Sequence, residues 1–441
     1  MALTGMQIYK SLPRTNCKEC GFPTCMAFAM QVAAGQKALA DCPEISDDAV
    51  SSLSEASAPP MKLVKIGTGD NTFETGQETV LFRHEEKFHR SCGIAIRIPA
   101  SMSDDDATKK IETSNNLQFQ RVGQTIAPKL IAVEVDGIAA ADRAKLAAEK
   151  STKPIVLVGK DTAKLTEAAE AIKDKKPLIY FADASNVDEL AKVAAGAKLA
   201  LAVAGNDLEE LADVAQKAKD AGVEDILLAF KNDKMGDTVR ALTQTRRAAL
   251  KHKFRILGYP TICEFSTTDP EEETVLAAIA AAKYAGIAIV DGIEPWELLP
   301  ILTLIQDVYT DPQVPNTVDA KLYEIGDVTE DSPVLFTSNF SLTYFSVAGE
   351  VERSKVPTYI AVVDTEGLGV LNAWAGDKIT AEKIVKTLTE QGVEGKVKHR
   401  KLIIPGLLPM FRAEIEDISE WKEVIIGPET AKEIPGFLNS L

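Results

Sequence analysis

Four cysteines near the start of the chain carry the clearest chemical signal in the sequence. Their spacing is Cys17-x2-Cys20-x4-Cys25-x16-Cys42, and the other two cysteines of the chain lie far away. Four thiolates hold a structural zinc ion or an iron–sulfur cluster in many proteins. In a large chain, crowded cysteines ligate metal more often than they form disulfides. The segment therefore predicts a metal site.

The spacing favours one type of metal site. Structural zinc sites usually contain two close pairs of ligands, whereas here three cysteines are close and the fourth is remote. That arrangement suits a cubane with three corners on one loop, so we expect a [4Fe–4S] cluster. Zinc and a metal-free structural role remain alternatives. Residues 26–40 are expected to form a helix that leads to Cys42.

Composition and charge restrict the function classes. The chain has 441 residues, of which 45% are hydrophobic and 26% charged, which is typical of a soluble globular protein of two to four domains. A net charge of −16 argues against nucleic acid as a partner. The apolar runs are too short to span a membrane, and residues 1–16 do not resemble an export signal. We therefore expect a cytoplasmic protein without a membrane partner.

The elements that would position these groups divide into three parts, residues 1–58, 59–325 and 326–441. A Ser/Pro-rich stretch at 51–60 reads as a linker after the first part. In the second part, helical segments such as 139–150, 162–173, 208–220 and 270–284 alternate with apolar runs, and Asp161, Asn206 and Thr268 are expected as caps. The expected strands are 93–98, 130–135, 155–158, 178–181, 199–203, 226–229, 261–265 and 287–290.

Apolar strands alternating with helices indicate a parallel sheet that helices cover. Eight such units fit a TIM (β/α)8 barrel. A doubly wound open sheet is the alternative, which we favour less because no Gly-rich dinucleotide fingerprint follows the first strand.

The third part predicts a small open α/β domain of the Rossmann or flavodoxin-like type. Its expected strands are 334–337, 358–364, 402–405 and 423–427, and its expected helices include 381–390 and 429–438. Ligands bind beyond the carboxyl ends of the strands in such sheets. The strands lead into loops at 338–343, 365–374, 406–409 and 428–430, and the second of these is long and apolar. An apolar loop suggests a partner or a flat ligand.

Polar residues also occur near the ends of the expected barrel strands, where barrel enzymes keep catalytic groups. They are Asp136, Asp183, Asn206, Glu264 and Asp291. No complete catalytic constellation stands out among them, so we interpret them as solvated caps or subunit contacts. Cys92 and Cys263 are interpreted as buried small hydrophobic residues.

The segment NCKECGFPTCMAFAMQVAAGQKALADCPE and the order of the three parts closely resemble the large (gamma) subunit of the corrinoid iron–sulfur proteins of the acetyl-CoA (Wood–Ljungdahl) pathway. The resemblance covers the whole chain. It implies a [4Fe–4S] domain, a barrel and a corrinoid-binding domain. It also implies a methyl carrier, whose corrinoid cobalt takes a methyl group as Co(I) from methyltetrahydrofolate on a separate methyltransferase. The methyl group then passes to the nickel site of acetyl-CoA synthase. Occasional oxidation leaves the cobalt as inactive Co(II), and an electron delivered through the [4Fe–4S] cluster repairs it.

The resemblance also implies site residues. Cys17, Cys20, Cys25 and Cys42 match the cluster motif one by one. The loops that match the corrinoid-binding loops supply Thr337, Asn339, Phe340, Thr343, Ser346, Gly367, Leu368, Gly369, Val370, Leu371, Asn372, Ala373, Trp374, Gly406, Leu407 and Ala431. The Asp-x-His-x-x-Gly motif that gives many B12 domains an axial histidine is absent, and His399 lies just before a strand. The family's corrinoid is held base-off, which eases reduction of the cobalt.

The implied partners are the small subunit, in a heterodimer, the methyltetrahydrofolate:corrinoid methyltransferase, CO dehydrogenase/acetyl-CoA synthase and a low-potential electron donor. An alternative function is a barrel methyltransferase that acts on a pterin itself and carries an appended redox domain. Tight binding of methyltetrahydrofolate by this chain alone would favour that alternative. A zinc-bearing scaffold without a redox role is a third, weaker possibility.

Overall fold

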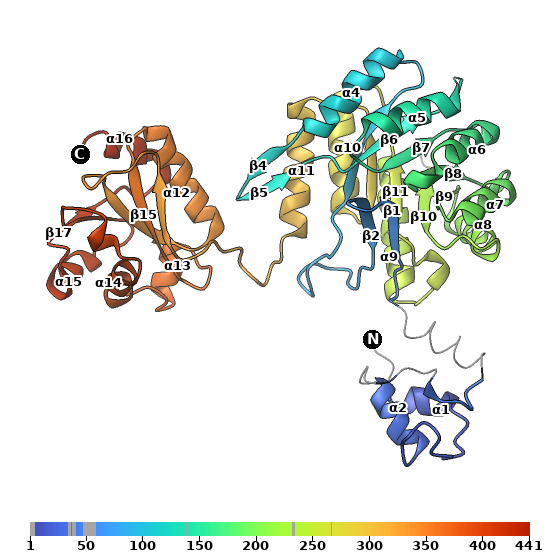
Figure 1. The fold of residues 1–441 in the computed structure, drawn as a ribbon, viewed down its shortest axis with the longest axis horizontal. Coiled ribbons are helices and arrows are strands. Elements are labelled where there is room, and N and C mark those ends of the chain that lie inside the picture. Colours follow the sequence, from blue (N-terminus) through green and yellow to red (C-terminus); the bar gives the residue numbers. More distant parts are fainter. Residues whose placement is uncertain are drawn as a thin grey trace.

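The structure, a computed structural model, describes residues 5–33, 37, 41–46, 59–137, 139–231, 234–265 and 267–441. Three bodies follow one another along the chain in the expected order (Figure 1). Within the described residues, every helix is too short or too polar to cross a bilayer.

The amino-terminal body is a small pair of helices. Helices α1 (Gly5–Ser11) and α2 (Cys25–Ala33) pack together around Ile8, Leu12 and Phe28. The expected helix at 26–40 is therefore present as far as Ala33. Residues 34–36 and 38–40 lie outside the described residues, as does 51–58 of the expected linker.

The central body is a closed barrel of eight parallel strands, which confirms the barrel and excludes the open sheet. Around the barrel the order is β3, β6, β7, β8, β9, β10, β11 and β12, and β12 pairs with β3 to close it. The bounds are β3 (Gly93–Ile98), β6 (Leu130–Glu134), β7 (Ile155–Val158), β8 (Leu178–Ala182), β9 (Ala200–Gly205), β10 (Ile226–Phe230), β11 (Thr261–Glu264) and β12 (Ile287–Val290).

Helices surround this barrel (Figure 1). They are α4 (Asp104–Asn116), α5 (Ala140–Lys150), α6 (Thr162–Ala171), α7 (Val187–Ala197), α8 (Leu208–Asp220), α9 (Met235–Leu250), α10 (Pro270–Ala282) and α11 (Pro295–Tyr309), with short turns η2 (Lys173–Lys175) and η3 (Arg255–Leu257). A hairpin of β4 (Phe119–Arg121) and β5 (Gln124–Ile126) follows α4.

Two of the three expected helix caps are displaced by one residue. Asp161 caps α6 as expected, but Asp207 rather than Asn206 caps α8, and Asp269 rather than Thr268 caps α10. In each case the aspartate carboxylate accepts two backbone N–H groups of the first helical turn, which satisfies donors that the helix leaves unpaired.

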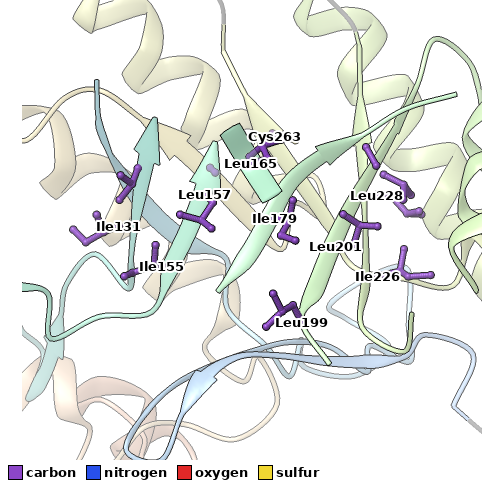
Figure 2. Close-up of a cluster of buried hydrophobic side chains, with 14 of the residues drawn as sticks. Ile131, Ile155, Leu157, Leu165, Ile179, Leu199, Leu201, Ile226, Leu228 and Cys263 are labelled. Atoms are coloured by element: carbon purple, nitrogen blue, oxygen red, sulfur yellow. The ribbon is translucent and has the colours of Figure 1, made fainter. Parts of the chain in front are cut away.

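The barrel buries apolar side chains on both faces of its strands. Small residues such as Ala132, Ala202 and Ala229 fill the interior. Figure 2 shows the outer layer, where larger side chains such as Leu157, Ile179 and Leu228 lie among the strands. Burial on both faces explains why these strands appear as continuous apolar runs in the sequence.

A hairpin that was not expected covers the amino ends of the barrel strands. It consists of β1 (Leu63–Thr68) and β2 (Asn71–Gly76), and its apolar face joins the interior cluster. The backbone N–H of Gly67 donates to the carbonyl of Lys176 (2.9 Å), just before β8. The Phe73 ring packs so tightly on Gly93 that a Cβ there would lie 2.5 Å from it. Because the hairpin covers the amino end of the barrel, a ligand of the barrel would bind at its carboxyl end.

A buried ion pair fastens the loop between β2 and β3. Glu78 and Arg246 are 5% and 4% exposed, and Arg246 Nη2 lies 3.2 Å from Glu78 Oε2. The other carboxylate oxygen accepts the backbone N–H groups of His89 (2.8 Å) and Arg90 (2.7 Å). Every oxygen of this buried carboxylate therefore has a donor, as a buried charge requires.

We expect Glu78→Gln to destabilise the barrel strongly. The substitution leaves the buried Arg246 guanidinium without a counter-charge, which costs about 3 kcal/mol of unfolding free energy. Denaturant unfolding followed by circular dichroism measures it. Glu74→Gln, which breaks the more exposed ion pair with Lys65, is the control and should cost less than about 1 kcal/mol. Equal losses for the two variants would contradict the assignment.

The carboxyl-terminal body is an open five-stranded sheet, as expected. Its order is β13-β15-β14-β16-β17, and all strands are parallel except the edge strand β13. The bounds are β13 (Leu322–Ile325), β14 (Val334–Ser338), β15 (Thr358–Val363), β16 (Lys401–Ile404) and β17 (Glu423–Ile426). The strand β13 precedes residue 326, where the sequence places the start of the third part.

Helices cover both faces of this sheet. Helices α12 (Ser341–Ser354) and α16 (Ile434–Leu438) share a core with one face, and α13 (Val370–Ala375), α14 (Ala381–Glu390) and α15 (Phe411–Ile418) share a core with the other. The short turns are η4 (Val393–Gly395) and η5 (Ala431–Glu433). Two expected loops are shorter than predicted, because α12 begins at Ser341 and α13 occupies the second half of 365–374.

Candidate functional site

The four amino-terminal cysteines lie on and around the start of α2. Cys25 is the first residue of that helix and is buried, as is Cys42, whereas Cys17 and Cys20 are half-buried on the preceding loop. The side chain of Asn16 accepts the backbone N–H of Cys25 (2.8 Å) and so ties the loop to the helix. Asn16, Lys18 and Gly21 have positive φ angles. The loop therefore curls tightly around its thiols.

The four clustered thiols lie near one another. Burial raises the pKa of Cys42, and the charges of the three other thiols raise it further. Four neighbouring thiols are a donor set that both a structural zinc ion and an iron–sulfur cluster can use.

A cavity of about 530 Å³ opens at the carboxyl ends of β14 and β16. The strand order reverses at β14, because β15, the next strand in sequence, lies on one side of it and β16, the strand after that, lies on the other. Ligands bind at such switch points in open α/β sheets. Helices α12 and α16 form the walls together with the start of α13. The position agrees with the loops that the sequence singles out.

The structure brings many of the expected corrinoid residues together in this cavity. Those that line it are Thr337, Thr343, Ser346, Gly369, Val370, Leu371, Asn372, Leu407 and Ala431. Most of the remaining lining is apolar, and Glu429 is its one charged side chain among the described residues. The cavity is therefore suited to a large, mostly apolar ligand.

One hydroxyl in the cavity wall has no partner in the described part of the chain. Thr337 is 2% exposed, and its Oγ1 makes no hydrogen bond. Buried polar groups in proteins are nearly always hydrogen-bonded, so this hydroxyl is an exception, although its oxygen exposes almost no surface to the cavity.

Seven expected residues do not line the cavity. Ala373 is fully buried in the core beneath α13, whereas Trp374 is 41% exposed. Gly367 packs on the connector from the barrel, where a Cβ would lie 2.6 Å from Pro315. Gly406 approaches the carbonyl of Gly427 so closely that a Cβ would lie 2.6 Å away. The last three are Asn339, Phe340 and Leu368, which hold turns rather than line the cavity.

Sequence reasoning missed the apolar walls. Val347 on α12 and Ile434, Phe437 and Leu438 on α16 line the cavity but were not expected there. Their spacing is that of an ordinary core-facing helix stripe, which gives no sign of a ligand.

His399 lies where the sequence places it, at the other end of the sheet. Its Nε2 is 2.9 Å from the carbonyl oxygen of Ser332, and it precedes β16. The lining of the cavity contains no histidine within the described residues. A protein imidazole is therefore not available to a ligand there.

The polar residues at the carboxyl end of the barrel are engaged in local structure. Asp136 accepts the backbone N–H groups of Lys160 and Asp161 (2.8 and 3.1 Å), and Asn206 donates to Glu210 (2.7 Å). Asp183 pairs with Lys231 (2.5 Å). Burial opposes ionisation of Asp183, but hydrogen bonds from Lys231 and Ser185 prevail and lower its pKa to about 2.

Arg97 occupies the opposite side of that barrel end. Its guanidinium lies 2.5 Å from Glu264, 3.0 Å from Asp291 and 3.7 Å from Glu134. Three carboxylates around one arginine form a self-contained ion cluster. These contacts agree with the interpretation of the five polar residues as structural groups rather than a catalytic constellation.

Two family models match the chain. The model described as CO dehydrogenase/acetyl-CoA synthase delta subunit matches residues 63–438. A model for an Fe-S cluster matches residues 12–44, which include all four clustered cysteines. Among solved structures, a Yersinia pestis DHPS with a pterine-sulfa conjugate matches with a TM-score of 0.38 and 12% identity, over 49% of this chain and 93% of that one.

Curated relatives match over nearly the whole length. The chain is 41% identical to the corrinoid/iron-sulfur protein large subunit of Moorella thermoacetica, over 99% of this chain and 98% of that protein. It is 35% identical to the acetyl-CoA decarbonylase/synthase complex subunit gamma of Methanopyrus kandleri, over 99% and 97%. The chain belongs to the family of corrinoid/iron-sulfur protein large subunits.

Proposed function

We propose that this chain is the methyl-carrying large subunit of a cytoplasmic corrinoid iron–sulfur protein. When bound, a corrinoid would supply a cobalt ion that takes a methyl group as Co(I) from methyltetrahydrofolate on a separate methyltransferase and gives it to the nickel site of acetyl-CoA synthase. A [4Fe–4S] cluster would supply the electron that returns Co(II) to Co(I).

The cavity beyond β14 and β16 is the observation that carries this proposal. It is mostly apolar, and it lies at the switch point of the sheet, where open α/β folds bind their ligands. The first turns of α12 and α13 and the turn η5 contribute to its lining, so these elements would hold the corrinoid. Family membership supports the same ligand class.

The absence of histidine from the described lining favours base-off binding. His399 is bound to Ser332 at the opposite end of the sheet and would have to cross the domain to reach the ligand. Without a basic lower ligand, Co(I) is easier to reach, since that state prefers few axial ligands. This chain would offer the cobalt no histidine nitrogen from the cavity lining, and its apolar walls would exclude water.

Cys17, Cys20, Cys25 and Cys42 would hold the cluster. Three of them are close together in sequence on one tight loop and the fourth is remote, which supports a cubane over zinc. Two of the thiols are buried against the core of the small body, which would keep solvent from that side of the cluster.

Exposed apolar side chains around the cavity support partners at this face. Leu342, Leu371, Trp374, Leu407 and Met410 are each at least 37% exposed. A patch of this kind marks a contact surface. We propose that the small subunit covers it in a heterodimer. The methyltransferase, CO dehydrogenase/acetyl-CoA synthase and a low-potential electron donor would be the further partners.

Metal and cofactor content tests the proposal. The chain is produced anaerobically with its small subunit, and iron, sulfide, cobalt and zinc are measured alongside the visible spectrum. The proposal predicts about four irons, about four sulfides and about one cobalt per heterodimer, with a base-off corrinoid spectrum. One zinc without cobalt would contradict it.

The alternative function, a pterin-dependent methyltransferase built on the barrel, is tested by binding. At the carboxyl end of the barrel, Arg97 pairs with Glu264 and Asp183 pairs with Lys231, so these polar side chains already have partners within the protein. We therefore expect methyltetrahydrofolate to bind weakly to this chain alone. Tight binding measured by calorimetry would favour the alternative.

A further inference from the structure

Asn339 lies at the carboxyl end of β14 but does not line the cavity. It is 5% exposed, and its backbone N–H donates to the carbonyl of Val363 (2.9 Å), the last residue of β15. Its own carbonyl accepts the N–H of Val318, in the connector from the barrel (2.9 Å). The residue therefore sits where two strands and the connector meet.

The side chain of Asn339 holds the turn that follows β15. Its Oδ1 accepts the backbone N–H groups of Thr365 and Gly367 (3.0 Å each) and lies 2.9 Å from the Thr365 hydroxyl. Its Nδ2 donates to Oδ1 of Asp364 (2.9 Å). The side-chain amide of Asn339 thus contacts this turn with both of its polar atoms: the oxygen accepts hydrogen bonds and the nitrogen donates one.

That turn determines where a wall of the cavity lies. It leads directly into Gly369, Val370 and Leu371, which line the cavity. Glu366 and Gly367 both have positive φ, and Gly367 has no space for a side chain against Pro315. Strand pairing cannot hold the turn because β15 has already ended. The amide of Asn339 therefore holds it from outside, alongside the hydrogen bonds that the turn makes within itself.

We propose that Asn339 is a positioning residue for the corrinoid. It would not touch the cofactor but would hold residues 364–369 so that the start of α13 meets the ligand. The inference rests on the proposed function, since it assumes that the cavity binds a corrinoid.

The contact between Asn339 and Asp364 allows a substitution that changes the hydrogen bonding of residue 339 without changing its size. Asn339→Asp keeps the shape and the acceptor oxygen but replaces the donor to Asp364 with a second carboxylate. Two carboxylates at this distance repel each other and open the turn. Adding Asp364→Asn restores an amide–carboxylate pair with its direction reversed, although the same atom of Asp364 also accepts the Glu366 N–H (3.0 Å), a bond that the reversed pair gives up.

Hydroxocobalamin titration of the full chain with its small subunit tests the inference. We expect N339D to weaken corrinoid binding by roughly tenfold or more. The double variant N339D/D364N should recover most of that loss, which a general packing defect at Asn339 would not. Asn115→Asp is the matched control, because Asn115 also bridges a turn, donating to Lys150 and accepting from Thr152, but on the barrel. It should bind like the unaltered protein.

The outcomes are distinguishable. If the unaltered protein binds no corrinoid, the proposed function fails. If it binds and N339D binds equally well, or if the double variant is as weak as N339D, only the positioning role fails. Should N339D not fold, Thr365→Val removes the hydroxyl that contacts both Asn339 Oδ1 and the Leu368 carbonyl, and it should weaken binding by roughly threefold. Unaltered affinity in that variant would also overturn the inference.

Discussion

Replacing Cys17 and Cys20 together with alanine is expected to abolish the iron–sulfur cluster. Both thiols are half-buried on the loop before α2, so their loss removes two ligands while the core around Phe28 remains. Iron and sulfide should fall below about a tenth of the normal content, because two cysteines cannot hold a cubane. Metal analysis and the visible spectrum measure the loss.

The cobalt content of that variant should stay normal, since the cavity lies in a different body of the chain. What should disappear is reactivation of oxidised corrinoid by a reductant. Cys92→Ala with Cys263→Ala is the matched control. Those thiols are buried, burial raises the pKa of both, and that of Cys263 reaches about 12. Their removal should leave iron unchanged. A normal iron content in the Cys17/Cys20 variant would refute the assignment.

Filling the carboxyl-terminal cavity should produce the second large effect. Ala431 begins the turn η5 and lines the cavity, so Ala431→Trp would place an indole in the space that the ligand needs. We expect cobalt per chain to fall by roughly tenfold or more, while iron is unchanged. Metal analysis of the anaerobically purified heterodimer provides the measurement.

The control for this variant must add the same side chain elsewhere in the domain. Ala413 lies on the exposed face of α15, so Ala413→Trp tests for a general effect of tryptophan. It should bind corrinoid normally. Normal cobalt in Ala431→Trp, or an equal loss in both variants, would show that the cavity is not the corrinoid site.

The barrel was predictable because its strands are buried on both faces. Runs such as 93–98, 155–158 and 287–290 contain almost no polar residues, and the structure places strands at these positions. The hairpin of β1 and β2 escaped prediction for the opposite reason. Its two strands together present only a few apolar side chains to the barrel, such as Val64, Ile66 and Phe73, so the pattern is too short to stand out from a loop.

Helix starts in the barrel were predictable to within a residue, but helix ends were not: the segments expected at 162–173 and 270–284 end at Ala171 and Ala282. The helix expected at 429–438 is only α16, from Ile434 to Leu438. At both α8 and α10, two adjacent polar residues could cap the helix, and the backbone of the preceding loop decides which one does. The half-loop that became α13 is short and mostly apolar, with Asn372 as its one polar residue, so the sequence alone does not distinguish a short helix from an exposed loop.

The residues of the candidate site were likewise predictable only in part. Loops after parallel strands are ligand sites by topology, so the Gly369–Asn372 stretch could be named in advance. Thr337, the last residue of an expected strand, was named because the family resemblance implies it. The walls from α12 and α16 could not, because an apolar residue that faces a cavity has the same sequence pattern as one in a core. Asn339 was expected to contact the ligand, yet its amide is used by its own turn. Residue type alone does not determine which partner a polar group finds.

Methyl transfer to the bound corrinoid tests the central claim most directly. The reduced heterodimer is mixed with labelled methyltetrahydrofolate under strictly anaerobic conditions, with and without the separate methyltransferase. We predict about one methyl group per cobalt when the methyltransferase is present and essentially none without it. Transfer by the heterodimer alone, or no methyl group on the corrinoid in either case, would contradict the role of this chain as a methyl carrier.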